Sequence, residues 1–316
     1  MTNARAFIFP GQGSQYVGMG KNLWETFAEA REVFQEVDES LGQKLSSLMF
    51  EGPVEDLNLT ENTQPALMAV SMAVMRVLEK QGRITVPVKA RFVAGHSLGE
   101  YSALTAAGMS PIAQTARLLK LRGQAMQKAV PVGVGAMAAI LGMSLEDVQA
   151  VAAQVSGKEI CDAANDNSVG QVVVSGHTAA VEAAIALAAE RGAKKSVILP
   201  VSAPFHCKLM EPAARAMHDA LASATFTVPS VPVVANVTAK AENDPLRIKD
   251  LLVEQVTGLV RWRESVLWIK NEGVNEMIEI GAGKVLAGLV RRIDKDIACE
   301  SVETPEQIEA LIKKLA

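Results

Sequence analysis

The chain has 316 residues, of which 49% are hydrophobic, 21% charged and only 4% aromatic, and its formal net charge is −4. These values are typical of a globular protein that is long enough to bury a large core, so they exclude a disordered chain. There is no basic excess and no run of basic residues, and the charge pattern therefore gives no support to nucleic-acid binding or to adsorption on an anionic membrane. We expect a substrate that is small or locally docked.

The apolar stretch near the N-terminus ends at Pro10 and is far too short for a signal peptide, and no later stretch approaches a membrane span. The three cysteines, Cys161, Cys207 and Cys299, are widely spaced and include no C-x-x-C pair. The sequence therefore predicts a cytoplasmic protein without a disulfide framework or a thiolate metal site.

The first 130 residues alternate between strand-like and helical patterns, which is typical of an α/β domain with a largely parallel sheet. Ser110 is the expected N-cap of the last helix in this part, and Pro111 its first residue. The expected strands are 4–9 and 91–94, and the expected helices are 23–38, 65–80, 101–107 and 111–129.

The order changes between 131 and 201 to strand, helix, strand, strand, helix, strand, which is the ferredoxin-like unit. The expected elements are 136–141, 145–155, 159–164, 171–175, 179–191 and 196–199. The segment 165–170 is rich in Asn, Asp, Ser and Gly, which favours a loop that joins a hairpin. We therefore predict a small subdomain at 131–201, inserted into a large subdomain made of 1–130 and 202–316, and a ligand site in the cleft between them.

The C-terminal part returns to the α/β pattern. Thr304 and Gln307 form a capping-box pattern at the start of the last helix. Before it we expect a strand at 231–237, helices around Leu251 and Val266, a strand at 274–280, a helix at 284–293 and a strand near Ala298.

The most specific local pattern is Gly95-His96-Ser97-Leu98-Gly99, which lies between a short apolar run and a helix of small residues. A serine on such a sharp strand-to-helix turn is exposed above the sheet, and the flanking glycines remove side chains that would clash there. Ser97 is therefore the candidate nucleophile, and the N–H of Leu98 is a candidate oxyanion donor. The alternative is a glycine-rich turn with an incidental serine.

His206 is the candidate general base, because its extended, proline-containing segment returns from the small subdomain at the cleft. The alternative is a structural histidine. Cys207 beside it is interpreted as a packing residue, since neighbours on an extended segment point to opposite sides and rarely form a Cys–His pair.

Arg122 lies on an apolar helical face with Leu118, Leu119, Ala125 and Met126. A buried guanidinium keeps its charge and needs a carboxylate or phosphate partner. That partner is either an internal Asp or Glu or an anionic group of a ligand, and helical spacing leaves both open.

The loop Gly11-Gln12-Gly13-Ser14-Gln15 follows the first strand. It lacks the third glycine of a dinucleotide fingerprint, so phosphate binding is a weak interpretation. Its backbone N–H groups lie at the carboxyl end of a strand, where they are placed to supply a second oxyanion donor.

With 11–15, 95–100, Arg122 and Pro204-Phe205-His206 in this order, the chain resembles the malonyl-CoA:acyl carrier protein transacylases of fatty-acid synthesis over essentially its whole length. The resemblance implies a hydrolase-like α/β domain that carries a ferredoxin-like insertion. It also implies that Ser97 is the nucleophile, that His206 is its base, and that the backbone carbonyl of Gln255 orients the histidine. The resemblance further implies that the N–H groups of Gln12 and Leu98 form the oxyanion hole and that Arg122 binds the malonyl carboxylate. Phe205 is implied to select malonyl over methylmalonyl, and Met126 and Asn165 are implied to line the pocket.

The activity implied is ping-pong transfer of malonyl from malonyl-CoA to the phosphopantetheine thiol of acyl carrier protein, by a monomer that uses no metal or redox cofactor. Two other functions share some of these features: a serine hydrolase such as a thioesterase, and a non-enzymatic docking subunit. An acidic carrier favours a basic rim, for which Arg191, Lys194 and Lys195 or Lys284, Arg291 and Arg292 are candidates, although both sets are equally consistent with solvated helix faces.

Overall fold

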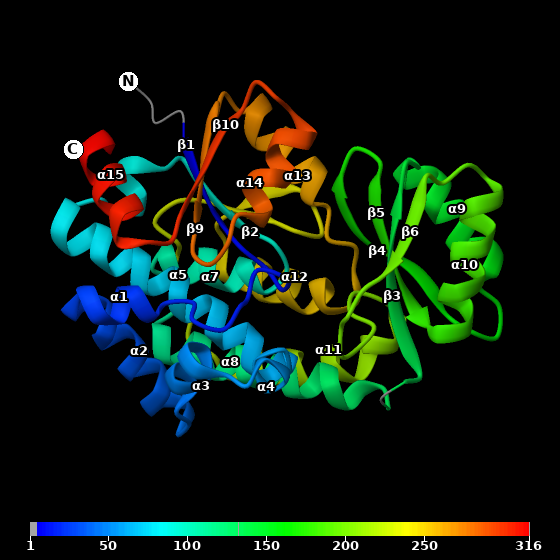
Figure 1. Cartoon of the computed structure of the whole chain (residues 1–316), viewed down its shortest axis with the longest axis horizontal. Helices are drawn as coiled ribbons and strands as arrows, with labels where there is room; N and C mark the ends of the chain where they lie inside the picture. Colours follow the sequence, from blue (N-terminus) through cyan, green and yellow to red (C-terminus); the bar gives the residue numbers. More distant parts are fainter. Residues whose placement is uncertain (1–4, 132, 316) are drawn as a thin grey trace.

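The computed structural model describes residues 5–131 and 133–315, and Figure 1 shows a larger part beside a smaller one, each built on its own sheet. The large sheet has the order β10-β9-β1-β2-β7-β8. Its first five strands are parallel, and β8 pairs antiparallel with β7. The strands are β1 (Arg5–Phe9), β2 (Phe92–Gly95), β7 (Val233–Ala235), β8 (Lys240–Glu242), β9 (Glu276–Ile280) and β10 (Ala298–Val302). Ala4, the first residue of the expected strand 4–9, lies outside the described residues.

Helices cover both faces of this sheet, because the side chains of β1 alternate between two cores. Phe7 and Phe9 belong to one core, whereas Ala6 and Ile8 belong to the other. The second core is covered by α13 (Trp262–Asn271) and α14 (Val285–Ile293). The first core is covered by α1 (Lys21–Thr26), α2 (Ala28–Leu41), α3 (Leu45–Glu51), α4 (Val54–Leu57), α5 (Thr60–Gly82), α6 (Val86–Lys89), α7 (Leu98–Ala106), α8 (Ile112–Ala129), α11 (Glu211–Ser223), α12 (Pro245–Thr257) and α15 (Pro305–Leu315).

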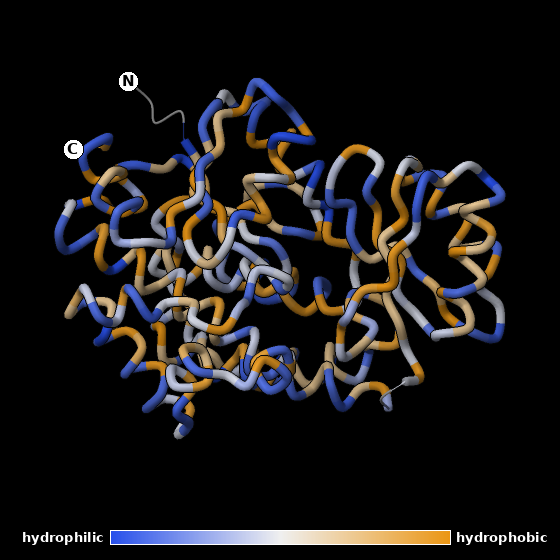
Figure 2. Tube along the Cα trace, viewed as in Figure 1, coloured by the Kyte–Doolittle hydropathy of each residue, from blue (hydrophilic) through white to orange (hydrophobic). Residues whose placement is uncertain are grey.

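The small sheet has the order β4-β5-β3-β6 with antiparallel pairing throughout, as in a ferredoxin-like unit. Apolar and polar stretches alternate along α9 and α10, which pack against one face of this sheet (Figure 2). The elements are β3 (Gly135–Leu141), α9 (Leu145–Val155), β4 (Cys161–Ser168), β5 (Gln171–His177), α10 (Thr178–Glu190) and β6 (Lys195–Ile198). The predicted fold class is therefore confirmed, whereas the boundaries at 130/131 and 201/202 stay a prediction.

The expected loop at 165–170 is wrong. Strand β4 runs to Ser168, and only Val169 and Gly170 form the turn. Asp166 N donates to Val260 O at 2.9 Å, and Val260 N donates to Ala164 O at 2.9 Å. Strand β4 is thus hydrogen-bonded to the large part on one side and to β5 on the other. Its pairing with β5 contains two register shifts.

Several helix starts also differ from the prediction, and the helix expected at 101–107 is α7, which begins at Leu98. The helix expected at 23–38 is two helices, because Phe27 is extended between α1 and α2 although no Gly or Pro marks the break. Helix α5 begins at Thr60, so Pro65 lies inside it. The N-cap of α8 is Pro111, and Ser110 Oγ accepts from the side chain of Gln114 at 2.8 Å instead of from a helix N–H.

The capping box at the last helix is confirmed, because Thr304 N donates to Gln307 Oε1 at 3.0 Å and Gln307 N donates to Thr304 Oγ1 at 3.4 Å. Cys207 is buried with its Sγ 3.1 Å from a backbone oxygen, which agrees with a packing residue. Within the described ranges, no helix combines the length and the apolar character that crossing a membrane requires.

Candidate active site

Ser97 lies on a sharp turn between β2 and α7, with φ 53° and ψ −111°. A non-glycine residue at positive φ is strained, and such strain persists only where the surroundings enforce it. The surroundings do so here, since a Cβ at Gly95 would lie 1.9 Å from Gly99 O and one at Gly99 would lie 2.3 Å from Phe9 O. The two glycines allow the turn to press against the end of β1.

His206 contacts the serine directly. Its Nε2 lies 2.7 Å from Ser97 Oγ, and its Nδ1 lies 2.8 Å from the backbone oxygen of Gln255. Because a carbonyl only accepts, Nδ1 carries the proton and Nε2 is free to accept from the serine hydroxyl. Burial, and secondly the charge of Arg122, lower the pKa of His206 to about 3. The imidazole is therefore neutral and able to act as a base.

Arg122 lies in α8 with 1% of its surface exposed. Its Nη1 donates to Gln64 Oε1 at 2.7 Å, and its Nη2 donates to Gln255 Oε1 at 2.9 Å and to Ser97 Oγ at 3.2 Å. Its Nε is buried without a partner. Among the described residues no carboxylate forms an ion pair with it, so the internal Asp or Glu partner is wrong. A desolvated cation thus lies beside the hydroxyl of the serine.

The two backbone amides predicted as an oxyanion hole belong to Leu98 and Gln12. Leu98 is the first residue of α7, where an amide has no partner within the helix. The loop that contains Gln12 packs against the turn, since a Cβ at Gly11 would lie 2.5 Å from His96 O. The side chain of Gln12 is fixed by Thr60 Oγ1 at 2.9 Å. The loop that contains Gln12 and the first residue of α7 thus meet at the turn of Ser97, and the role of the two amides as an oxyanion hole stays a prediction.

The family model described as acyl transferase domain matches residues 6–307. The malonyl CoA-acyl carrier protein transacylase of Bacillus subtilis (strain 168) is 45% identical over 98% of this chain and 96% of that protein. The crystal structure of an acyl-carrier-protein-S-malonyltransferase from Bartonella henselae is 57% identical with a TM-score of 0.96, over 98% of this chain and 99% of that one.

The chain belongs to the acyl transferase domain family. It is accordingly an acyltransferase. A further solved structure, described as a type II PKS acyl-carrier protein in complex with its malonyl-transacylase, is 41% identical to this acyltransferase with a TM-score of 0.94, over 98% of this chain and 99% of that one.

Three further residues were predicted to line the pocket of this acyltransferase. Phe205 is buried directly before the histidine. Met126 is buried with its Sδ 3.7 Å from Gln64 Nε2. Asn165 is buried in β4 and forms a bridge with Val260, at the contact between the two sheets. Their roles in substrate binding stay predictions.

Sequence reasoning missed three polar residues of the site. Asn236 follows β7, and its Oδ1 accepts from Ser97 N at 2.7 Å while its Nδ2 donates to Gly95 O at 2.7 Å. A polar residue after a buried strand is a signal that points to this edge of the sheet. Gln64 was overlooked because the helix was expected to begin after it. Glu100 stands in the quoted motif without an assigned role.

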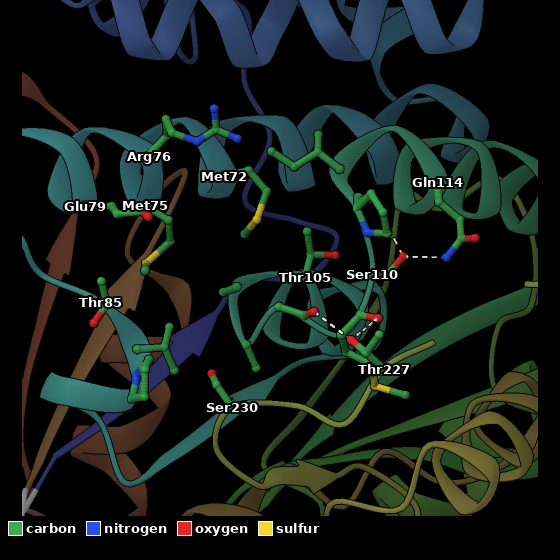
Figure 3. A pocket seen from close by; sticks show the side chains of 18 of the residues that line it. Met72, Met75, Arg76, Glu79, Thr85, Thr105, Ser110, Gln114, Thr227 and Ser230 are labelled. Atoms are coloured by element: carbon green, nitrogen blue, oxygen red, sulfur yellow. Dashed lines mark hydrogen bonds between the residues drawn. The ribbon is translucent and has the colours of Figure 1, made fainter. Parts of the chain in front are cut away.

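A separate hollow of about 600 Å³ lies between α5 and the end of α7 (Figure 3). Its lining includes Met72, Met75, Arg76 and Thr105 and none of the predicted site residues. In residues 5–131 and 133–315, no group of three or more His, Cys, Asp or Glu is placed to hold a metal ion.

Proposed function

We propose that this acyltransferase moves a malonyl group from malonyl-CoA to the phosphopantetheine thiol of acyl carrier protein, by a ping-pong mechanism through a malonyl ester of Ser97. The observation that carries the proposal is the position of Arg122. Its guanidinium forms no ion pair with a carboxylate of the described residues, and it donates to Ser97 Oγ at 3.2 Å. An acyl group on this oxygen can form an ion pair with the cation only if it carries an acid group of its own, as malonyl does. The names of the relatives support the same acyl group and acceptor.

The first half-reaction begins at the bond between Ser97 and His206. The Nε2 of His206 accepts the hydroxyl proton while Ser97 Oγ attacks the thioester carbon. The carbonyl oxygen becomes an oxyanion, to which the amides of Gln12 and Leu98 donate. As the oxyanion collapses, the C–S bond breaks, and the imidazolium returns the proton to the departing thiolate of coenzyme A. The carbonyl of Gln255 keeps the imidazole in the required tautomer.

The acyl group is selected by charge and by size. In the free site, three donor contacts of Arg122 end on neutral oxygens, and Nε is unpartnered. Arg122 is a buried cation that lacks contact with water. The malonyl carboxylate would supply the negative charge that this cation lacks, so it is bound strongly. The ring of Phe205 would crowd an α-methyl substituent, which favours malonyl over methylmalonyl. Met126 and Asn165 complete the pocket.

The second half-reaction reverses the first with a different thiol. The neutral His206 accepts the proton of the phosphopantetheine thiol, the sulfur attacks the ester carbon, and the bond to Ser97 Oγ breaks with return of the proton to the serine. Proton transfer and oxyanion stabilisation are supplied by residues of the chain, and we propose that no metal or redox cofactor takes part. We further propose that the monomer is the active form.

Of the two basic clusters, we propose Lys284, Arg291 and Arg292 as the carrier-docking surface. All three are exposed, on or beside α14. A Cβ added at Gly283 would lie 3.4 Å from Ser14 O, so the start of this helix adjoins the loop that contains Gln12. Arg292 also donates to Gln171 Oε1 of the small sheet at 3.0 Å, which places the cluster across the junction of both parts.

Intact-protein mass spectrometry after brief mixing with malonyl-CoA tests the proposal. Wild type should gain one malonyl group, located on Ser97 by peptide mapping, whereas Ser97→Ala should gain none. An adduct at another residue would contradict the nucleophile assignment. An adduct that water clears before a carrier can accept it would favour a thioesterase, and an inert wild type would favour a docking subunit.

A further inference from the structure

A buried carboxylate lies one turn from the nucleophile and has no part in the mechanism above. Glu100 is in the first turn of α7 with 1% of its surface exposed. Its Oε2 accepts from Asn236 N at 3.0 Å and from Gln255 Nε2 at 2.8 Å. Burial raises the pKa of Glu100 to about 7, against the effect of these donors and of Arg122. Burying a carboxyl group without an ion pair lowers the free energy of unfolding, so we expect Glu100 to have a role in function.

Its first partner, Gln255, holds three parts of the site together. The Nε2 of Gln255 donates to Glu100 and also to Ser97 O at 3.0 Å. The opposite end of the amide, Oε1, therefore faces Arg122 Nη2 at 2.9 Å. The orientation of an amide is decided by its partners, and here the NH₂ end has three acceptors, of which Asn236 Oδ1 is the most distant at 3.4 Å. Loss of the carboxylate would remove the shortest of these three bonds and so weaken the preference for the orientation in which Oε1 faces the guanidinium.

Its second partner, Asn236, holds the strained turn. The side chain of Asn236 bonds to the backbone on both sides of His96, at Ser97 N and Gly95 O. The carboxylate of Glu100 binds the backbone N of the same asparagine. One oxygen thus fixes both the residue that clamps the turn and the residue that orients Arg122.

We propose that Glu100 is a positioning residue for acyl-group selection: by fixing the amide of Gln255 it directs an oxygen at Arg122 and so keeps the guanidinium aimed at an acyl carboxylate on Ser97. This inference rests on the proposed function. It predicts that loss of the acceptor harms malonyl more than acetyl, because only malonyl uses the guanidinium. It also predicts that glutamine is an adequate substitute, because a single oxygen accepts both bonds.

The test compares Glu100→Met, which fills the space without an acceptor, with Glu100→Gln. The rate constant for acylation, kcat/KM, is measured with malonyl-CoA and acetyl-CoA. We expect Glu100→Met to lower the malonyl-to-acetyl ratio about tenfold or more, which is the effect of losing one charge-assisted hydrogen bond. A loss that acts through Asn236 and the turn of Ser97 would lower both rates and leave this ratio unchanged. Glu100→Gln should keep the ratio within about threefold of wild type. A merely structural residue would lower both rates equally, and that result would overturn the proposal.

Gln255→Met supplies the second arm and stays informative if Glu100→Met does not fold. It removes the amide but keeps the backbone carbonyl that holds His206, so it should also lower the malonyl-to-acetyl ratio. In the double variant the two losses should not multiply, because they act through one chain of bonds. An unchanged ratio in Gln255→Met, or losses that multiply, would overturn the inference. Wild type is run in parallel: failure to accept malonyl there would instead refute the proposed function.

Discussion

Replacing Arg122 with methionine should abolish the preference for an acyl group that carries an acid. The guanidinium has five N–H donors, and three are used by Gln64, Gln255 and Ser97. One carboxylate can take two donors on the same edge of the guanidinium, the free Nε–H and an N–H of Nη2 that replaces its bond to Ser97 Oγ when this oxygen is acylated. At about 1.5 to 3 kcal/mol for each charged hydrogen bond, the loss of two costs roughly 3 to 6 kcal/mol. At about 1.4 kcal/mol per factor of ten, the rate falls by between roughly a hundredfold and ten-thousandfold.

The assay is single-turnover acylation followed by quench and intact mass, with malonyl-CoA and acetyl-CoA in parallel. The malonyl rate of Arg122→Met should fall by the factor above, while the acetyl rate should hold or rise, since a buried cation no longer faces an uncharged acyl group. Arg117→Met is the matched control, because Arg117 is exposed on the same helix, and it should behave as wild type. A malonyl preference retained in Arg122→Met would refute the assignment of the clamp.

Three further predictions concern size, pH and packing. Phe205→Ser should raise acylation by methylmalonyl-CoA relative to malonyl-CoA about tenfold, and an unchanged ratio would contradict a selecting role. Because burial lowers the pKa of His206 to about 3, the base stays neutral as the pH falls. The acylation rate of Glu100→Gln, which lacks the buried carboxyl group with a pKa of about 7, should therefore show no inflexion near the ordinary histidine pKa of about 6.5, and an inflexion there would contradict this. Gly95→Ala places a Cβ 1.9 Å from a backbone oxygen and should lower the free energy of unfolding in urea by more than about 3 kcal/mol. Gly288→Ala, a helical position with no atom within 4 Å of the added Cβ, should instead be neutral or stabilising by up to about 1 kcal/mol; similar losses in both would refute the packing argument.

The site residues that could be predicted are those marked by a pattern in the neighbouring sequence. The glycines beside Ser97 mark a turn that no other residue type permits, and the helical spacing of Arg122 predicts its burial. The placement of His206 was predictable from the expected order of elements, because that order brings its segment back to the cleft. These signals depend on neighbours in the sequence.

Residues that act through distant partners were missed. Asn236 and Gln64 reach the site because the sheet and α5 bring them there. The position of Asn236 after a buried strand indicates the edge of the sheet but not the contact with Ser97. The error at 165–170 has the same origin. Residues that favour turns by themselves were held in a strand, since Asp166 accepts from Arg263 Nε at 2.9 Å and Asn167 lies 2.8 Å from His96 Nε2. Tertiary bonds outweighed the local preference.

The measurement that tests the central claim most directly is the fate of the isolated malonyl enzyme. The adduct is freed of malonyl-CoA and then mixed with buffer, with free coenzyme A, or with carrier protein that carries its phosphopantetheine arm, and both proteins are followed by mass. The account predicts an adduct that persists in buffer, returns to coenzyme A, and moves to the carrier with loss from Ser97 and equal gain on the carrier. Release of free malonate at the same rate with and without carrier would contradict it.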